Sequence, residues 1–153
     1  MPVATAEWNN QLVITTGDGQ VSIVDEAGTL ISNALLESLG DQSTHVFRLE
    51  TYTLSDRVLV LMGSQSTSRV STTLTAFDPD SGNVTWSREF ERELHLDISG
   101  DGSIAINSHI WQEYPAFIRI FGLGGYSTFQ FMWIDGHAGE TILSTDRGKL
   151  ETA

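Results

Sequence analysis

The amino-acid sequence predicts an all-β fold, and three observations support that prediction. Short runs rich in Val, Ile, Leu, Thr and aromatic residues recur along the chain, separated by clusters of Gly, Asp, Asn and Ser. The segment 74–86 has the pattern of a β-hairpin, and weaker copies of it lie before and after it. The chain has 153 residues, 40% of them apolar, which is enough to bury the core of a single domain covering residues 1–153.

The hairpin segment combines two half-buried strands with a tight acidic turn. Leu74 and Ala76 on one side, and Val84 and Trp86 on the other, alternate with polar neighbours, as the residues of one strand face do. The turn between them, residues 78–82, reads Asp-Pro-Asp-Ser-Gly. These residue types favour tight turns, and the glycine can adopt a positive φ. The segment is therefore expected to form a β-hairpin.

This hairpin resembles a motif of the quinoprotein-like (pyrroloquinoline-quinone-type) β-propeller repeat family. It fits the pattern Ala-x-Asp-x-x-Thr-Gly-x-x-x-Trp of those blades, with Ser81 at the Thr position and Asn83 where Lys is common. In that family the Trp packs between neighbouring blades, and the Gly and Thr support its docking. The resemblance implies a structural role in blade docking, and no catalytic role, for the matching residues: Ala76, Asp78, Ser81, Gly82 and Trp86.

Two degenerate copies of the motif suggest a repeated unit. Gly28 and Gly139 lie 54 and 57 residues from Gly82, which is close to the length of one four-stranded blade with its loops. Ser32 and Leu143 stand where the first and third copies place the Trp. We therefore expect about three four-stranded antiparallel blades, with approximate repeats at 8–40, 45–90 and 94–146.

Further strands are predicted from β-rich runs around the three turns. They are expected at 11–16, 21–24, 57–62, 74–77, 94–98, 104–106, 117–121 and 128–134. Residues 33–39 are the only segment with a helical pattern.

Three blades cannot close a ring, because closed propellers usually have four to eight. The sequence thus predicts a partial β-propeller that belongs to a longer propeller or completes itself by assembly, and a β-sandwich is the alternative. In either architecture the edge strands have unpaired backbone N–H and C=O groups that can form hydrogen bonds with another chain, so self-association is expected.

Composition excludes several classes of function. Twenty acidic residues face eight basic ones, so the chain lacks the clustered cations that nucleic-acid binding requires. No apolar run approaches the roughly 18 residues of a membrane span, and the first residues lack the pattern of a signal peptide. Propellers of the family that this chain resembles are often extracytoplasmic, whereas the chain shows no export signal. The sequence therefore leaves the compartment undecided. There is no cysteine, which excludes disulfides and thiolate chemistry.

Metal and cofactor sites have little support in the sequence. Residues 78–89 place acidic groups at the first, third and twelfth positions of a calcium loop, but Gly82 and Asn83 break the pattern and the flanks are strand-like. Calcium is therefore kept only as a minor alternative to a plain turn. The four histidines show no metal-ligand spacing. The family resemblance raises quinone binding, but no residue matches the cofactor contacts, and we expect no cofactor.

The function that these patterns favour is a non-catalytic structural or protein-binding module within a larger assembly. No catalytic constellation is present, and the family resemblance includes propellers that hold other proteins. Trp111 and Tyr114 mark a possible contact loop, because aromatic and polar residues beside a proline are typical of contact sites. A carbohydrate-binding module and a fragment of a quinoprotein dehydrogenase are the alternatives.

Overall fold

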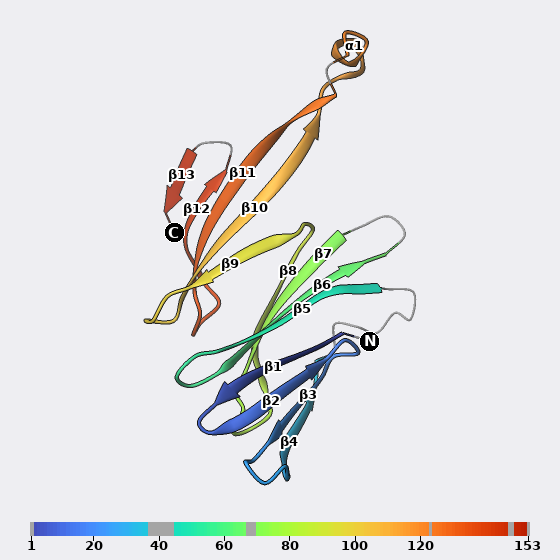
Figure 1. The fold of residues 1–153 in the computed structure, drawn as a ribbon. Helices are drawn as coiled ribbons and strands as arrows, with labels where there is room; N and C mark the ends of the chain where they lie inside the picture. The colour runs from blue at the N-terminus through green and yellow to red at the C-terminus, as the bar shows by residue number, and fades with distance from the viewer. Residues whose placement is uncertain (1, 37–44, 67–69, 123, 147–148, 153) are drawn as a thin grey trace.

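The computed structural model describes residues 2–36, 45–66, 70–122, 124–146 and 149–152. Within these ranges the chain forms three successive antiparallel sheets, which we call blades 1, 2 and 3 (Figure 1). Blade 1 contains β1 (Val3–Trp8), β2 (Gln11–Thr16), β3 (Gln20–Val24) and β4 (Leu30–Leu35). Blade 2 contains β5 (His45–Thr53), β6 (Val58–Gln65), β7 (Val70–Phe77) and β8 (Val84–Phe90). Blade 3 contains β9 (Leu94–Ile98), β10 (Ser103–Glu113), β11 (Gly125–Asp135), β12 (Thr141–Asp146) and β13 (Lys149–Thr152), and the short helix α1 (Ala116–Arg119) lies between β10 and β11.

The strand order within each blade follows the order of the chain. Neighbouring strands are antiparallel, and no strand passes from one sheet to another. The strands of a sandwich, by contrast, pass between two sheets through Greek-key connections. The fold is therefore the expected partial β-propeller of three antiparallel blades, and the sandwich alternative does not describe it. Blade 3 differs from the expectation in having a fifth strand, β13, at its edge.

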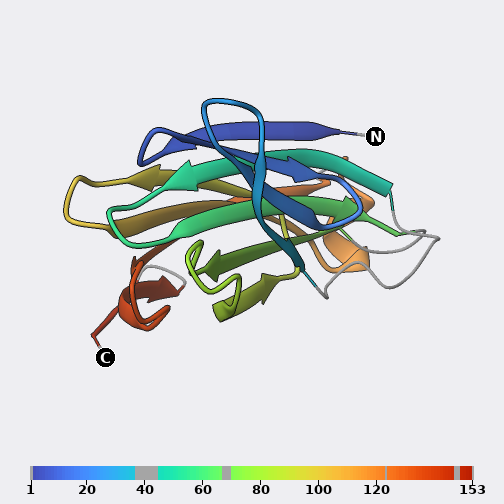
Figure 2. The same ribbon diagram turned by 90° about the horizontal axis from the view of Figure 1, so that it is seen from below.

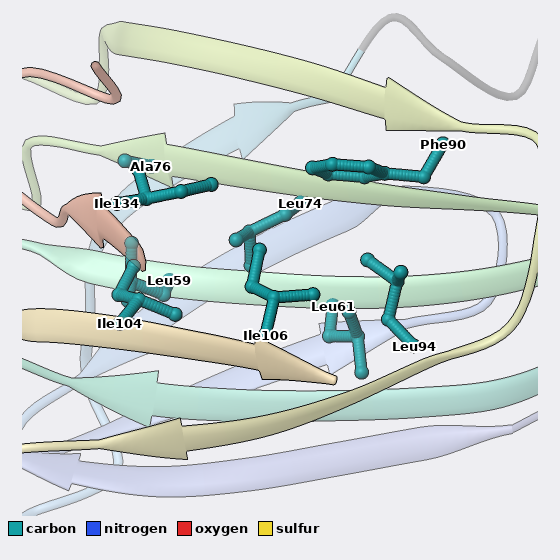
Figure 3. Close-up of a cluster of buried hydrophobic side chains, with 9 residues drawn as sticks. All are labelled: Leu59, Leu61, Leu74, Ala76, Phe90, Leu94, Ile104, Ile106 and Ile134. Carbon is teal, nitrogen blue, oxygen red and sulfur yellow. The ribbon is translucent and has the colours of Figure 1, made fainter. Parts of the chain in front are cut away.

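Blade 2 is apolar on both faces because successive residues of a strand point to opposite sides of the sheet. In β6, Val58 and Val60 pack toward blade 1, whereas Leu59 and Leu61 pack toward blade 3. The second of these interfaces is shown in Figure 3 and consists of Leu59, Leu61, Leu74, Ala76, Phe90, Leu94, Ile104, Ile106 and Ile134. Full burial of one such apolar side chain stabilises the fold by about 1.5–3 kcal/mol. Because both buried clusters lie between neighbouring blades, the core of this protein is at its blade interfaces.

The first strands of blades 1 and 2 lie next to each other. β1 contacts β5, and Figure 2 shows the two strands running side by side. Nearby, the hydroxyl of Thr51 on β5 donates a hydrogen bond to Thr15 Oγ1 on β2, at 3.0 Å. The first strand of a blade thus faces the preceding blade, as expected of the innermost strand in a propeller.

Two sequence-based predictions of secondary structure are wrong. Asn33–Leu35 belong to β4, where β3 supplies their backbone partners, and not to a helix; residues 37–39 lie outside the described residues. Residues 117–121 were expected to be a strand but form the end of α1 and a turn. Pro115 has no N–H to donate to a ladder, and its carbonyl accepts the first helical bond from Arg119 N at 3.2 Å. Among the described residues, no helix could span a membrane.

Candidate functional site

The motif turn after β7 is stabilised by its own side chains. Asp78 Oδ1 accepts a hydrogen bond from the backbone N of Asp80 at 2.9 Å, and Asp78 Oδ2 accepts one from the Ser81 hydroxyl at 2.7 Å. These bonds, that of Ser81 foremost, lower the pKa of Asp78. Gly82 has φ +71°, a conformation that favours glycine. Asp78 and Ser81 thus shape the turn, and Gly82 permits it.

The same contacts bear on the calcium alternative. The turn already uses both carboxylate oxygens of Asp78, and Glu89 lies well along the strand β8. Calcium requires six to eight oxygen ligands around one point. Within the described ranges, no three His, Asp or Glu side chains are close enough together to hold a metal ion.

Trp86 connects blade 2 to the β11–β12 turn of blade 3. Its indole Nε1 donates a hydrogen bond to the carbonyl oxygen of Gly136 at 3.0 Å. The ring lies so close to Gly139 that a Cβ added there would be 2.7 Å from Trp86 Cγ and Cδ2. Ala76, the cross-strand partner of Trp86, is fully buried in the core between blades 2 and 3. The structure therefore brings the blade-2 motif residue against blade 3.

Two arginines of blade 2 contact the same turn. Arg88 Nη1 donates to the carbonyl oxygen of Gly139 at 3.2 Å and to Thr141 Oγ1 at 2.9 Å. Arg57 donates to the carbonyl oxygen of His137, and His137 Nδ1 lies 3.1 Å from Asp56 Oδ1. The hydrogen bond from Arg57 is the main cause that lowers the pKa of Asp56 to about 2. No sequence pattern marked Arg57 and Arg88, because their partners are backbone carbonyls about 80 and 50 residues away, respectively.

A polar network follows one face of β5. Arg48, Glu50 and Tyr52 are spaced two residues apart, so their side chains share that face. Arg48 Nε donates to Glu50 Oε1 at 2.7 Å, and the Tyr52 hydroxyl donates to the other carboxylate oxygen. Arg48 also donates to the carbonyl oxygen of Leu94 in blade 3. Burial is the first cause that raises the pKa of Tyr52 to about 12, and the bond to Glu50 adds to it. The network thus joins blade 2 to blade 3.

The ends of the blades surround a hollow of about 540 Å³. Ala6 of blade 1, Tyr52 and Leu54 of blade 2, and the segment 98–102 of blade 3 line it. Within it the Ser99 hydroxyl donates to Asp101 and lowers the pKa of that carboxyl to about 2. A general base that activates serine works best with a pKa near the operating pH. Asp101, with its lowered pKa, is therefore unsuited to act as the base for Ser99.

An apolar tip ends the long hairpin formed by β10 and β11. The two strands pair from Ser103–Asp135 to Glu113–Gly125, and the hairpin projects away from the other blades with α1 at its end (Figure 1). Three large apolar side chains are exposed there: Phe117 (68%), Ile120 (78%) and Phe121 (79%). We call these three residues the apolar tip. Sequence analysis missed them, because an apolar run with strand propensity does not show which of its residues remain uncovered.

The two residues of the expected contact loop lie just before this tip. Trp111 belongs to strand β10 and not to a loop, and its side chain is outside the described part of the structure. Tyr114 follows the strand, and its side chain is half-buried. The backbone N of Tyr114 donates to the carbonyl oxygen of Gly124 at 3.3 Å, which continues the ladder by one step. The exposed aromatic groups thus begin three residues after Tyr114.

Successive up-and-down antiparallel sheets, packed face to face through two apolar cores, define this chain as a partial β-propeller. No family model matches the chain, and no curated protein matches it. Among solved structures, the chain is similar to the crystal structure of BamB from Moraxella catarrhalis, with 11% sequence identity and a TM-score of 0.41. The match covers 92% of this chain and 47% of that one, so the chain spans about half the length of that structure.

Proposed function

We propose that this chain is a non-catalytic propeller-type module that binds another protein through its apolar tip, as part of a larger assembly. The observation that carries the proposal is the exposure of Phe117, Ile120 and Phe121 together at the end of a projecting hairpin. Single exposed apolar residues are common, but a cluster of large ones marks an interaction surface. Aromatic anchors of this kind dominate the binding energy of many protein interfaces.

The tip has an ordered backbone, which favours a binding role. Arg119 N donates to the carbonyl oxygen of Pro115 at 3.2 Å, and Gly122 N donates to that of Arg119 at 3.0 Å. Arg119 also forms an ion pair with Glu113 at 2.6 Å, which connects the tip to the end of β10. A preformed loop loses less conformational entropy on binding than a flexible one. Insertion of one phenylalanine into a partner's pocket would contribute about 1.5–3 kcal/mol.

The chemistry of the tip favours a protein partner over the other classes. A net charge of −12 opposes nucleic acid and anionic lipid surfaces. Sugar-binding sites combine flat aromatic faces with polar groups, whereas the tip presents two phenylalanines and an isoleucine. The family resemblance and the docking residues of blade 2 support a scaffold role, with Trp86 and its motif neighbours holding the blades together.

Site-specific photo-crosslinking in the native host tests this proposal. A photoreactive amino acid is placed at Phe121 and, as the matched control, at Val84, which is 47% exposed on blade 2. We expect a discrete protein adduct from position 121 that position 84 does not form. The adduct partner is then identified and purified, and Phe121→Ser should weaken its binding at least about tenfold, the equivalent of 1.4 kcal/mol.

Three results would contradict the proposal. They are equal adducts from both positions, no adduct from position 121, and unchanged affinity of the identified partner for Phe121→Ser. Two further assays address the alternatives directly. Sedimentation with phosphatidylcholine vesicles that depends on Phe121 would assign the tip to a lipid surface. Saturable quenching of tryptophan fluorescence by a glycan would favour a carbohydrate-binding module.

A further inference from the structure

The hairpins that join the third and fourth strands of the three blades share two backbone features. In each, the backbone N of one turn glycine (Gly28, Gly82 or Gly139) donates to the carbonyl oxygen of the Asp that opens the turn, and this glycine has a positive φ of +80°, +71° or +72°. The turn of blade 1 is one residue shorter than the other two. In each, the strand register also shifts at the same place, just before that Asp. The cross-strand pairs that precede this shift are Ile23–Ser32, Ala76–Trp86 and Trp133–Leu143.

Within the chain, the second member of each of the first two pairs lies beside the turn glycine of the next blade. Trp86 of blade 2 lies against Gly139 of blade 3. Ser32 of blade 1 lies near Gly82 of blade 2, where an added Cβ would be 3.4 Å from the Ser32 hydroxyl oxygen. The two internal interfaces therefore repeat one contact, in which each blade places this side chain on the turn glycine of its successor.

At the two ends of the chain the same contact is incomplete. No described atom other than its chain neighbours lies within 4 Å of a Cβ added at Gly28, the turn glycine of blade 1. A hollow of about 570 Å³ lies beside Gly28, with Leu12 and Val24 in its lining. Leu143 occupies the equivalent of the Trp86 position on blade 3, which is the last blade of the chain. Among the described residues, the turn glycine of blade 1 thus lacks the side-chain contact that the other two turn glycines have, and Leu143 of blade 3 is at the position that supplies this contact in the other blades.

Leu12 and Val24, which line the hollow beside Gly28 together with polar residues such as Glu7 and Glu26, occupy positions that are covered in the other two blades. In each blade, one cross-strand pair at the same register position lies on the face that points toward the preceding blade. In blade 1 this pair is Leu12 and Val24. The corresponding positions of the other blades are buried to 1% exposure or less: Val58 and Phe77 in blade 2, and Ile104 and Ile134 in blade 3. In blade 1 the residues are equally apolar, yet Leu12 is 42% exposed because no blade lies against it.

The outer face of blade 3 carries large apolar residues on β11 and β12, beside polar residues of β9 and β10 such as Asp97 and Asn107. Trp133 and Leu143 are directly opposite each other across β11 and β12, so their side chains share one face of the sheet, and Phe131 lies two residues away on that face. The equivalent of Trp133 in blade 2 is Ala76, which is fully buried. Trp133, in contrast, is 40% exposed.

We propose that a second copy of this chain covers both faces, so that blade 3 of each copy packs on blade 1 of the other. Leu143 of one copy would lie beside Gly28 of the other, in the manner of Trp86 on Gly139. A second copy is the occupant that the structure favours, because each exposed face is equivalent to a face that already packs against its counterpart inside the chain. Two three-bladed copies form a six-bladed ring with two equivalent junctions, within the range of four to eight blades that close.

Solution mass with two charge variants tests this proposal. Sedimentation velocity of the unmodified chain over a concentration series should show a dimer of twice 16.8 kDa. Leu12→Glu and Leu143→Glu should each weaken dimerisation at least about tenfold, because each buries an unpaired carboxylate in both junctions. Val84→Glu, at an exposed position of blade 2 away from both faces, is the control and should leave the dimer intact. Circular dichroism of each variant verifies that it is folded.

Mixing the two variants separates a junction effect from general destabilisation. A pair of Leu12→Glu and Leu143→Glu copies retains one unaltered junction, so an equimolar mixture should associate more tightly than either variant alone. A monomer at all soluble concentrations, loss of the dimer in Val84→Glu, or no gain on mixing would each overturn the proposal.

Cross-linking gives an independent test, since the chain contains no cysteine. Under oxidising conditions, a mixture of Gly28→Cys and Leu143→Cys chains should form a disulfide-linked heterodimer. A mixture of Gly28→Cys and Phe121→Cys chains should not. Equal cross-linking in the two mixtures would overturn the assigned junction even if the chain were dimeric.

Discussion

A methyl group added at Gly139 is expected to destabilise the fold more than the same group added at Gly28. Both glycines occupy the same turn position with similar φ values, +72° and +80°. An alanine in this left-handed region costs about 1–2 kcal/mol at either site. The two sites differ in their surroundings, because Trp86 lies against Gly139 while nothing described lies within 4 Å of the Gly28 position.

The additional cost at Gly139 follows from the contact with Trp86. An added Cβ would be 2.7 Å from two indole carbons, well inside their van der Waals contact distance, so the ring must move. Overpacking of this kind typically costs about 1–3 kcal/mol. A displaced ring also loses its 3.0 Å hydrogen bond to Gly136, worth about 1 kcal/mol. We therefore expect Gly139→Ala to cost about 3 kcal/mol or more, and Gly28→Ala about 1–2 kcal/mol.

Urea unfolding followed by circular dichroism measures both costs. The measurements belong in the Leu143→Glu background, which keeps a second copy away from Gly28. A double-mutant cycle isolates the contact: in a Trp86→Ala chain, Gly139→Ala should cost only the backbone strain, about 1–2 kcal/mol. Equal costs for the two glycines, or an unchanged cost of Gly139→Ala without the indole, would refute the reasoning that Trp86 docks on this turn.

Three further outcomes are expected. Trp86→Phe removes the indole donor to Gly136 and should lower the free energy of unfolding by about 1 kcal/mol, against less than about 0.5 for the exposed control Glu89→Ala; similar values would contradict the hydrogen bond. Because Arg48 lowers the pKa of Glu50, that carboxylate contributes stability that is complete above its unfolded pKa of about 4.3 and is lost as the pH falls through its lower folded pKa. Glu50→Gln should accordingly flatten the fall of Tm in acid, and an unchanged slope would argue against this linkage. Calcium should leave Tm unchanged in calorimetry, since Asp78 already uses its carboxylate oxygens; a rise that Asp78→Asn abolishes would establish a calcium site.

The hairpin at 74–86 could be predicted because its bonds are local. Asp78 accepts hydrogen bonds from residues two and three positions ahead, and Gly82 alone accounts for the positive φ. Such a turn depends on residue types within a few positions, which a sequence displays directly. The equivalent turns at Gly28 and Gly139 follow the same rule, so the spacing of the blades was also predictable.

The tip of the β10–β11 hairpin could not be predicted in the same way. Its ladder joins residues as far apart as Ser103 and Asp135, and the length of that ladder decides that Trp111 is in a strand and that α1 is at the end. The run 117–121 has strand propensity, but it found no partner strand. Phe121 is likewise exposed because no other described segment packs over it, and the local sequence does not show which segments pack together.

Composition and bonds between residues close along the chain are enough to predict the all-β class, the acidic character, the turns and their repetition. The tertiary structure sets which faces meet. It placed Trp86 on the turn of the next blade, connected Arg57 and Arg88 to carbonyls of blade 3, and left Leu12 and Trp133 uncovered at the two ends. Sequence cannot show this because burial depends on two surfaces that meet: the same apolar position is buried where a neighbouring blade covers it and exposed where none does.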